Sequence, residues 1–188
     1  MSYVDARYIS AAVEAAAVAL LWQATDAGDG GDGFPIGDNE DGVVSGSGAR
    51  YVQRVIDRVP YFTEAVTAFM TANAGLLEQG RVTAEQAGHD LILTANGHGA
   101  GFWDRGLDMP ANDAEALAAY MQGPALYASY LDIRRVTGDR APVQSVGDAL
   151  TEACRGYSFD AEFTLGPRGA VTWLMVENTV IVGRADLH

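Results

Sequence analysis

The sequence predicts an α+β fold that is mostly helical, with a small antiparallel sheet formed by a central hairpin and a C-terminal meander. Alanine-rich stretches with apolar residues at helical spacing occupy most of the first 80 residues. The short apolar run "DLILTA" is followed by Asn96-Gly97, a dipeptide typical of tight hairpins. After residue 159, three strand-like runs are separated by "GPRG" and by Glu177-Asn178.

Three helices are expected in the first part of the chain. Residues 4–24 are rich in alanine, and their larger apolar residues recur at helical spacing. Glycine, aspartate and proline then exclude regular structure over residues 25–42. A second helix is predicted over residues 48–59, and a third follows Pro60 over residues 61–80.

The centre of the chain predicts a change from helix to strand. Thr83 is a plausible cap for one short helical turn. The run "DLILTA" is then expected to be the first strand of the hairpin, and "HGAGFWD", residues 98–104, its returning strand. In this register His89 faces Asp104, whereas His98 lies at the turn.

Three further helices are expected over residues 111–122, 124–138 and 143–156. The first has Asn112 or Asp113 as its cap, and Pro124 opens the second. The domain organisation follows from this order. Residues 1–140 form a helical core with the central hairpin, and residues 141–188 form a C-terminal helix and β-meander packed on the same domain.

The composition indicates a soluble cytoplasmic protein. The chain carries 25 acidic and 12 basic residues, a net charge of −13, which argues against binding to nucleic acid or to an anionic membrane. The apolar N-terminal run "ISAAVEAAAVALLW" is interrupted by Glu14 and is shorter than the ~20 residues that a membrane span requires. The single Cys154 lies in an apolar-periodic stretch and is expected to be a small core residue.

No metal site is predicted. If Asp29 opened a calcium-binding EF-hand loop, Gly31 and Gly33 would stand where oxygen ligands are needed, and Phe34 would replace the required glycine. In an ideal hairpin His89 and His98 would lie about 30 Å apart, at ~3.3 Å per strand residue, which is too far for one metal ion.

The stretch from His89 to Gly106 is the densest candidate for a binding site. Glycines on its returning strand permit a ligand to approach the backbone, and the following residues supply an aromatic ring, an acid and a base. Packing of Phe102 and Trp103 in the core is the alternative interpretation. The predicted ligand- or partner-binding residues are Asn96, His98, Trp103, Asp104 and Arg105.

The sequence predicts no catalytic residue and no cofactor. The glycine pattern matches neither a Rossmann fingerprint nor a P-loop. No Gly-x-Ser-x-Gly elbow is present, and Cys154 has no histidine nearby in the sequence. An enzymatic activity is therefore the less favoured expectation.

The run "LTANGHGAGFWDR" resembles a motif of uncharacterised small accessory proteins of tailed bacteriophages. The likeness covers roughly residues 8–120 and includes "AGHD" directly before the motif, although Ala95 stands where the family commonly has arginine. The resemblance implies a phage-encoded, non-structural protein that acts in the infected host cell. It implies no particular activity.

Two functions remain open at this point. The first is an interaction protein that binds a host protein, for host takeover or against a host defence. The second is a small-molecule or nucleotide-binding protein, or an enzyme, that uses the Asn96–Arg105 segment. A virion component is a third and weaker reading, and a homo-oligomer remains open. Convergence of His98, Trp103 and Asp104 in one pocket would favour the second function.

Overall fold

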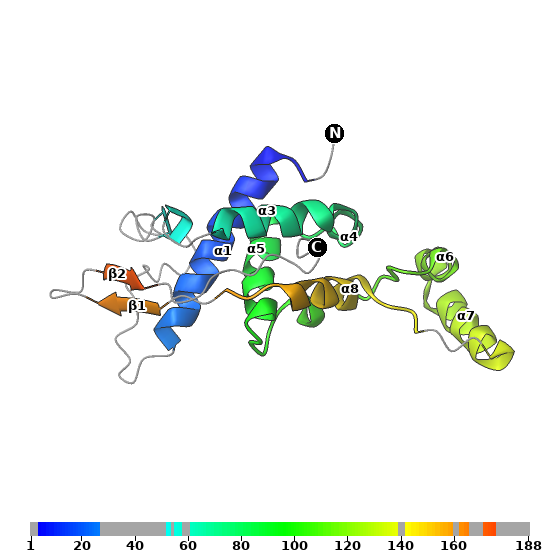
Figure 1. Ribbon diagram of the computed structural model, residues 1–188. Helices are drawn as coiled ribbons and strands as arrows, with labels where there is room; N and C mark the ends of the chain where they lie inside the picture. Colours follow the sequence, from blue (N-terminus) through cyan, green and yellow to red (C-terminus); the bar gives the residue numbers. More distant parts are fainter. Residues whose placement is uncertain are drawn as a thin grey trace, which may run out of the picture.

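Two parallel helices, α1 (Ala6–Asp26) and α5 (Ala84–Ala95), pack along each other at the centre of the molecule (Figure 1). At one end the Tyr8 hydroxyl donates to the backbone oxygen of Val82, and at the other the Asn96 amide donates to Gln23. The structure is a computed structural model, and it describes residues 4–26, 52–53, 55–57, 61–138, 142–159, 162–165 and 171–175.

Local sequence explains where these two helices begin. Asp5 accepts hydrogen bonds from the backbone N–H groups of Arg7 and Tyr8, so it caps the first turn of α1. Thr83 accepts a hydrogen bond from the N–H of Gln86 at the start of α5. The predicted cap at Thr83 is thus confirmed, but it starts a helix of three turns rather than a short isolated one.

The core forms where other short helices meet the α1–α5 pair. These are α3 (Phe62–Ala72), α4 (Ala74–Gln79) and α8 (Val146–Ala153), with the 3-10 turns η1 (Phe102–Asp104) and η2 (Cys154–Gly156). Phe69 and Phe102 stack inside this core with ring centroids 5.8 Å apart. The buried Cys154 belongs to it too, as predicted, and burial raises the pKa of its thiol.

The central hairpin was predicted wrongly, because "DLILTA" is the second half of α5 and not a strand. Leu91, Ile92 and Leu93 are all buried, since α5 is covered on more than one side by α1, α3 and the two 3-10 turns. A helix that is buried nearly all round loses its apolar periodicity, and a short apolar run then resembles a strand.

The dipeptide Asn96-Gly97 ends the helix instead of turning a hairpin. Gly97 is left-handed, with φ 73°. The N–H of His98 donates to the oxygen of Leu93, and the N–H of Gly97 donates to the oxygen of Thr94. These two bonds constitute a Schellman C-cap, in which a glycine with positive φ is as favourable as in a type I′ turn.

The predicted α+β class is therefore wrong, because the part of the chain that the structure describes between residues 4 and 159 is all-α. Residues described between 4 and 159 include no β-strand. Of the predicted meander, the structure describes two short strands that pair antiparallel, β1 (Glu162–Leu165) and β2 (Val171–Met175). The third strand-like run lies outside the described residues, as does much of the predicted helix over residues 48–59. Of the irregular stretch predicted over residues 25–42, the first two residues belong to α1 and the others lie outside the described residues.

The remaining helices, α6 (Ala114–Gln122) and α7 (Pro124–Thr137), begin as predicted, with Asp113 as the cap of α6 and Pro124 in the first turn of α7. They pack on each other and lie apart from the central helices in Figure 1. Beyond residue 141, α8 returns to the core and packs against η1 and α4. None of the described helices has both the length and the apolar character needed to cross a bilayer.

Candidate functional site

The predicted binding motif contributes several contacts that join the central helices to the rest of the core. Asn96 lies at the end of α5, where its Nδ2 donates to Oε1 of Gln23 at 2.7 Å. Its Oδ1 accepts a hydrogen bond from the N–H of Phe159 at 3.1 Å. Asn96 therefore connects α1, α5 and the segment after η2, and both ends of its amide are already occupied.

The glycines of the motif bring the chain back against α5. A Cβ atom on Gly101 would lie 2.2 Å from Oγ1 of Thr94, so only glycine fits at this approach. The next N–H, that of Phe102, donates to the same Oγ1 at 3.2 Å. This turn places the Phe102 ring in the core, which confirms the packing interpretation for Phe102.

Arg105 makes the strongest polar contact of the motif. Its Nε donates to both carboxylate oxygens of Asp90 at 3.0 Å, and its Nη2 donates to Oδ1 at 2.6 Å. Asp90 is fully buried, whereas the Arg105 side chain is 35% exposed. The hydrogen bond to Asp90 raises the pKa of Arg105, and the pair holds η1 against α5.

The other three predicted residues lie at the surface. His98 and Asp104 are exposed, and Trp103 is 51% exposed. The predicted pairing of His89 with Asp104 is also wrong, because it depended on the hairpin. On the helix, the His89 ring lies instead beside that of Trp22, with centroids 6.5 Å apart.

A groove of about 710 Å³ runs between α1 and α5, and of the predicted binding residues it includes only Arg105. Burial lowers the pKa of His89 at its edge, against the opposing effect of Asp90, and so favours the neutral imidazole. No three metal-ligating side chains of the described residues come together. Apart from His89 and Arg105, the lining includes Ala11, Glu14, Ala15, Val18 and Glu85.

The most distinctive surface feature is a helical arm, which we define as α6 and α7. Two chain segments, one entering and one leaving the arm, pair to form its neck. The N–H of Ala111 donates to the backbone oxygen of Gln144, and the N–H of Val146 donates to the backbone oxygen of Met109, each at 2.8 Å. The side chain of Gln79 on α4 donates to the oxygen of Pro110 in this neck. The neck is therefore bound to the body, while the two helices beyond it pack chiefly on each other.

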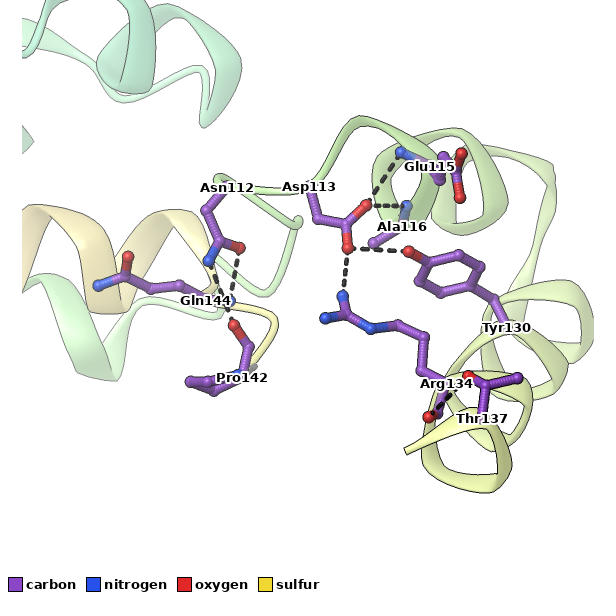
Figure 2. A network of polar contacts seen from close by, with 9 residues as sticks. All are labelled: Asn112, Asp113, Glu115, Ala116, Tyr130, Arg134, Thr137, Pro142 and Gln144. Carbon is purple, nitrogen blue, oxygen red and sulfur yellow. Dashed lines mark hydrogen bonds and ion pairs between the residues drawn. The ribbon is translucent and has the colours of Figure 1, made fainter. Parts of the chain in front are cut away.

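Asp113 organises the base of the arm, as Figure 2 shows. One carboxylate oxygen accepts from the N–H groups of Glu115 and Ala116, which caps α6. The other accepts from the Tyr130 hydroxyl at 2.8 Å and from the guanidinium of Arg134, both on α7. A single carboxylate thus joins the start of one helix to the middle of the other.

Neighbouring Asn112 closes the neck in the same view (Figure 2). The N–H of Gln144 donates to Oδ1 of Asn112 at 2.8 Å, and Nδ2 of Asn112 donates to the oxygen of Pro142 at 3.2 Å. Both candidate caps from the sequence therefore have a role. Asp113 caps the helix, and Asn112 connects the outgoing and returning segments.

We expect Asp113→Ala to loosen the arm while the body stays folded. Loss of the cap alone costs about 1 kcal/mol, and the contacts to Tyr130 and Arg134 are lost with it. Hydrogen exchange should show faster exchange in α6 and α7 and unchanged exchange in α5. Asp132→Ala removes only an exposed ion pair with Arg135 and is the matched control, with little effect expected. Equal exchange in both variants would contradict the assigned role.

Acid should have a related effect on the arm. The hydrogen bond from the N–H of Ala116, and then that from Tyr130, lower the pKa of Asp113. A carboxyl whose pKa is lower in the folded state adds stability above its unfolded pKa of ~3.9, and this stability is lost as pH falls through the folded pKa. We expect the amides of α6 to lose protection below about pH 4 in the wild type and to respond less in Asp113→Ala.

The arm exposes an apolar stripe, defined as Leu126, Ile133 and Val136 on α7, with Ser129 between them on the same face. The spacing of three, four and three residues puts these side chains on one face of the helix. Leu126, Ile133 and Val136 are 51%, 61% and 83% exposed. A different face of α7 contacts α6 and its cap, through Tyr127, Tyr130 and Arg134. None of the 14 residues of α7 is buried.

Sequence reasoning predicted both arm helices but missed their separation from the body. The apolar stripe is the sequence signal that bears on this separation. An ordinary surface helix turns such a face toward the core, so the stripe needs either a core or a partner to cover it. The sequence gives no partner for that face, so its exposure becomes visible only in the folded chain. The Asp90–Arg105 pair was missed because the hairpin prediction placed Asp90 on a strand.

Comparison with known proteins identified no relative of this chain. No protein-family model matches this chain, and neither a curated protein nor a solved structure does.

Proposed function

We propose that this chain is an interaction protein that binds another protein through the apolar stripe of the arm. The observation that supports this most is the exposure of three large aliphatic side chains on one face of α7, a helix with no buried residue. Isolated helices of this length are marginally stable in water. A partner that covers the stripe would bury apolar area and stabilise the helix at the same time.

The geometry favours a different protein over a second copy of this chain. The stripe spans less than two heptads, whereas self-pairing coiled coils repeat their seam over three or more. Each copy of the chain carries a net charge of −13, so two copies held side by side would repel each other. The helices of the arm are themselves neutral, since Arg134 and Arg135 offset Glu115 and Asp132. An apolar groove on the partner is therefore the complementary surface.

The resemblance to phage accessory proteins suggests the kind of partner. We propose that the partner is a protein of the infected host cell. The small-molecule alternative has less support, because His98, Trp103 and Asp104 are exposed and none of them lines the groove between α1 and α5.

A photo-crosslinking amino acid at Ser129, on the face of the stripe, should capture the partner in the host cell. The same group at Ala128, on the opposite flank of α7, is the matched control and should capture much less. Equal capture from both positions would contradict docking through the stripe. A crosslink between two copies of the chain would show that the stripe pairs the protein with itself.

Replacing Leu126, Ile133 and Val136 by glutamine should abolish that partner's co-purification. Glutamine has good helix propensity, so α7 should keep its helicity in circular dichroism. Ala128→Gln with Leu131→Gln changes the other flank and should leave binding within about twofold. We also expect the wild type to sediment as a monomer. A dimer that the stripe substitutions dissociate would overturn the choice of a foreign partner.

A further inference from the structure

Both chain segments of the neck start from the 3-10 turn η1. The outgoing segment leaves η1 at Arg105, and Leu107 already belongs to the neck, because its backbone oxygen accepts the N–H of Gly147 at 3.0 Å. The returning segment lies against the same turn, since a Cβ atom on Gly147 would be 2.9 Å from the oxygen of Phe102. The direction in which the arm leaves the body therefore depends on how η1 is held.

A buried ion pair holds η1 to the central helices. The carboxylate of Asp90 on α5 is fully buried, and it accepts three hydrogen bonds from the Arg105 guanidinium, of 2.6 to 3.0 Å. Bonds from two nitrogens of a planar group fix the rotation of that group as well as its distance. Arg105 is thus the residue through which α5 orients the base of the arm.

Stability alone does not account for an ion pair at this position. Two charges lose their hydration when they are buried, and apolar side chains of similar volume often give a protein that is equally or more stable. What an apolar contact lacks is direction. The directional bonds between Asp90 and Arg105 are therefore the feature that apolar residues could not replace.

We propose that Asp90 and Arg105 are positioning residues, which hold the arm in one orientation relative to the body and so present the stripe in a fixed geometry. A binding surface that is already oriented loses less entropy when its partner binds. The inference rests on the proposed function only for what the arm presents. It gives the Asn96–Arg105 segment the role of supporting the arm.

Pulsed EPR with two spin labels measures this orientation in the full chain, without a partner. One label replaces Glu14 on α1 and the other replaces Ala128 on α7, and both positions are exposed. The labels are attached to introduced cysteines, and the native Cys154 is buried and should not react. We expect a single narrow distribution of distances between the labels. A broad distribution would mean that the arm has no fixed orientation, and it would overturn the proposal.

The main test variant is Asp90→Leu with Arg105→Met, which should stay folded because apolar side chains replace both charges. We expect this variant to lose the single narrow peak and to spread over several distances between arm and body. An unchanged peak would overturn the proposal. Glu152→Leu with Arg155→Met is the matched control, since it makes the same replacements at an exposed ion pair and should leave the peak unchanged.

Label pairs inside each part distinguish a reoriented arm from an unfolded one. A pair at Glu14 and Glu64 reports on the body, and a pair at Ala118 and Ala128 reports on the arm, all at exposed positions. Both pairs should keep narrow distributions when the ion pair is replaced. Equal broadening of all three label pairs would show that the ion pair stabilises the whole fold, and that it does not position the arm.

Arg105→Lys separates the direction of the hydrogen bonds from the charge. Lysine keeps the positive charge but carries a single nitrogen on a flexible stem, so it does not reproduce the fixed geometry of the guanidinium. This variant should retain more stability than Arg105→Met and still broaden the distances between arm and body. An unchanged distribution in Arg105→Lys would show that charge alone is sufficient, and it would overturn the assigned cause.

The two proposals fail separately, because the label distances involve no partner. Distances as expected without any capture from Ser129 would remove the interaction protein and retain the positioned arm. Capture from Ser129 by a chain whose arm moves freely would have the opposite meaning. If both proposals hold, replacing the ion pair should reduce capture about tenfold when the arm is correctly oriented about one-tenth of the time. Unchanged capture would overturn the link between orientation and binding.

Discussion

Replacing Gly88 by alanine is expected to destabilise the protein by about 3 kcal/mol or more, enough to unfold much of it. At Gly88 the backbone of α5 lies close against that of α1. A Cβ atom at this position would be 2.0 Å from the oxygen of Ala12 and 2.9 Å from the nitrogen of Ala16. Both are backbone atoms of a long helix, so neither can move aside as a flexible side chain would.

The sign of this effect is diagnostic. Glycine to alanine in the interior of a helix ordinarily stabilises a protein by roughly 1 kcal/mol. Gly75 in α4 is the matched control, since a Cβ atom there meets nothing within 4 Å. Urea unfolding followed by circular dichroism should therefore show Gly75→Ala at or above wild-type stability and Gly88→Ala far below it. A Gly88→Ala protein as stable as the wild type would mean that α1 and α5 do not pack as described.

Removing the charge of Arg105 should produce the second large effect. In Arg105→Met the aliphatic stem remains, but the carboxylate of Asp90 is left buried without its partner. Breaking a buried ion pair in this way costs 3–5 kcal/mol. Because the Arg105 side chain is 35% exposed, water screens part of the interaction. We therefore expect a loss of about 2–3 kcal/mol in the free energy of unfolding.

Two further variants test the cause of that loss. Arg155→Met breaks the exposed pair with Glu152 and should change stability by less than about 0.5 kcal/mol. The double variant Asp90→Leu with Arg105→Met replaces the pair by apolar side chains and should recover part of the stability. If Arg105→Met matched Arg155→Met, the Asp90 pair would not hold η1 to α5.

The starts of several helices could be predicted from the sequence because capping is a local interaction. Thr83 and Asp113 each satisfy backbone N–H groups within three residues, and Pro124 needs only a first-turn position. The burial of Cys154 followed similarly from the apolar pattern around it. The candidate binding site could not be read in this way, because its prediction depended on how Asn96-Gly97 turns the chain.

The sequence by itself determined where most helices begin, that a core is available, and that the chain carries a charge of −13. Only the tertiary structure decided that Leu91, Ile92 and Leu93 belong to a helix, since burial on several sides removes the period that marks one. It also decided that Arg105 pairs with Asp90 and that the stripe on α7 faces solvent. Such outcomes depend on which elements meet in space, and contacts between distant segments leave no signal in the local pattern of either segment.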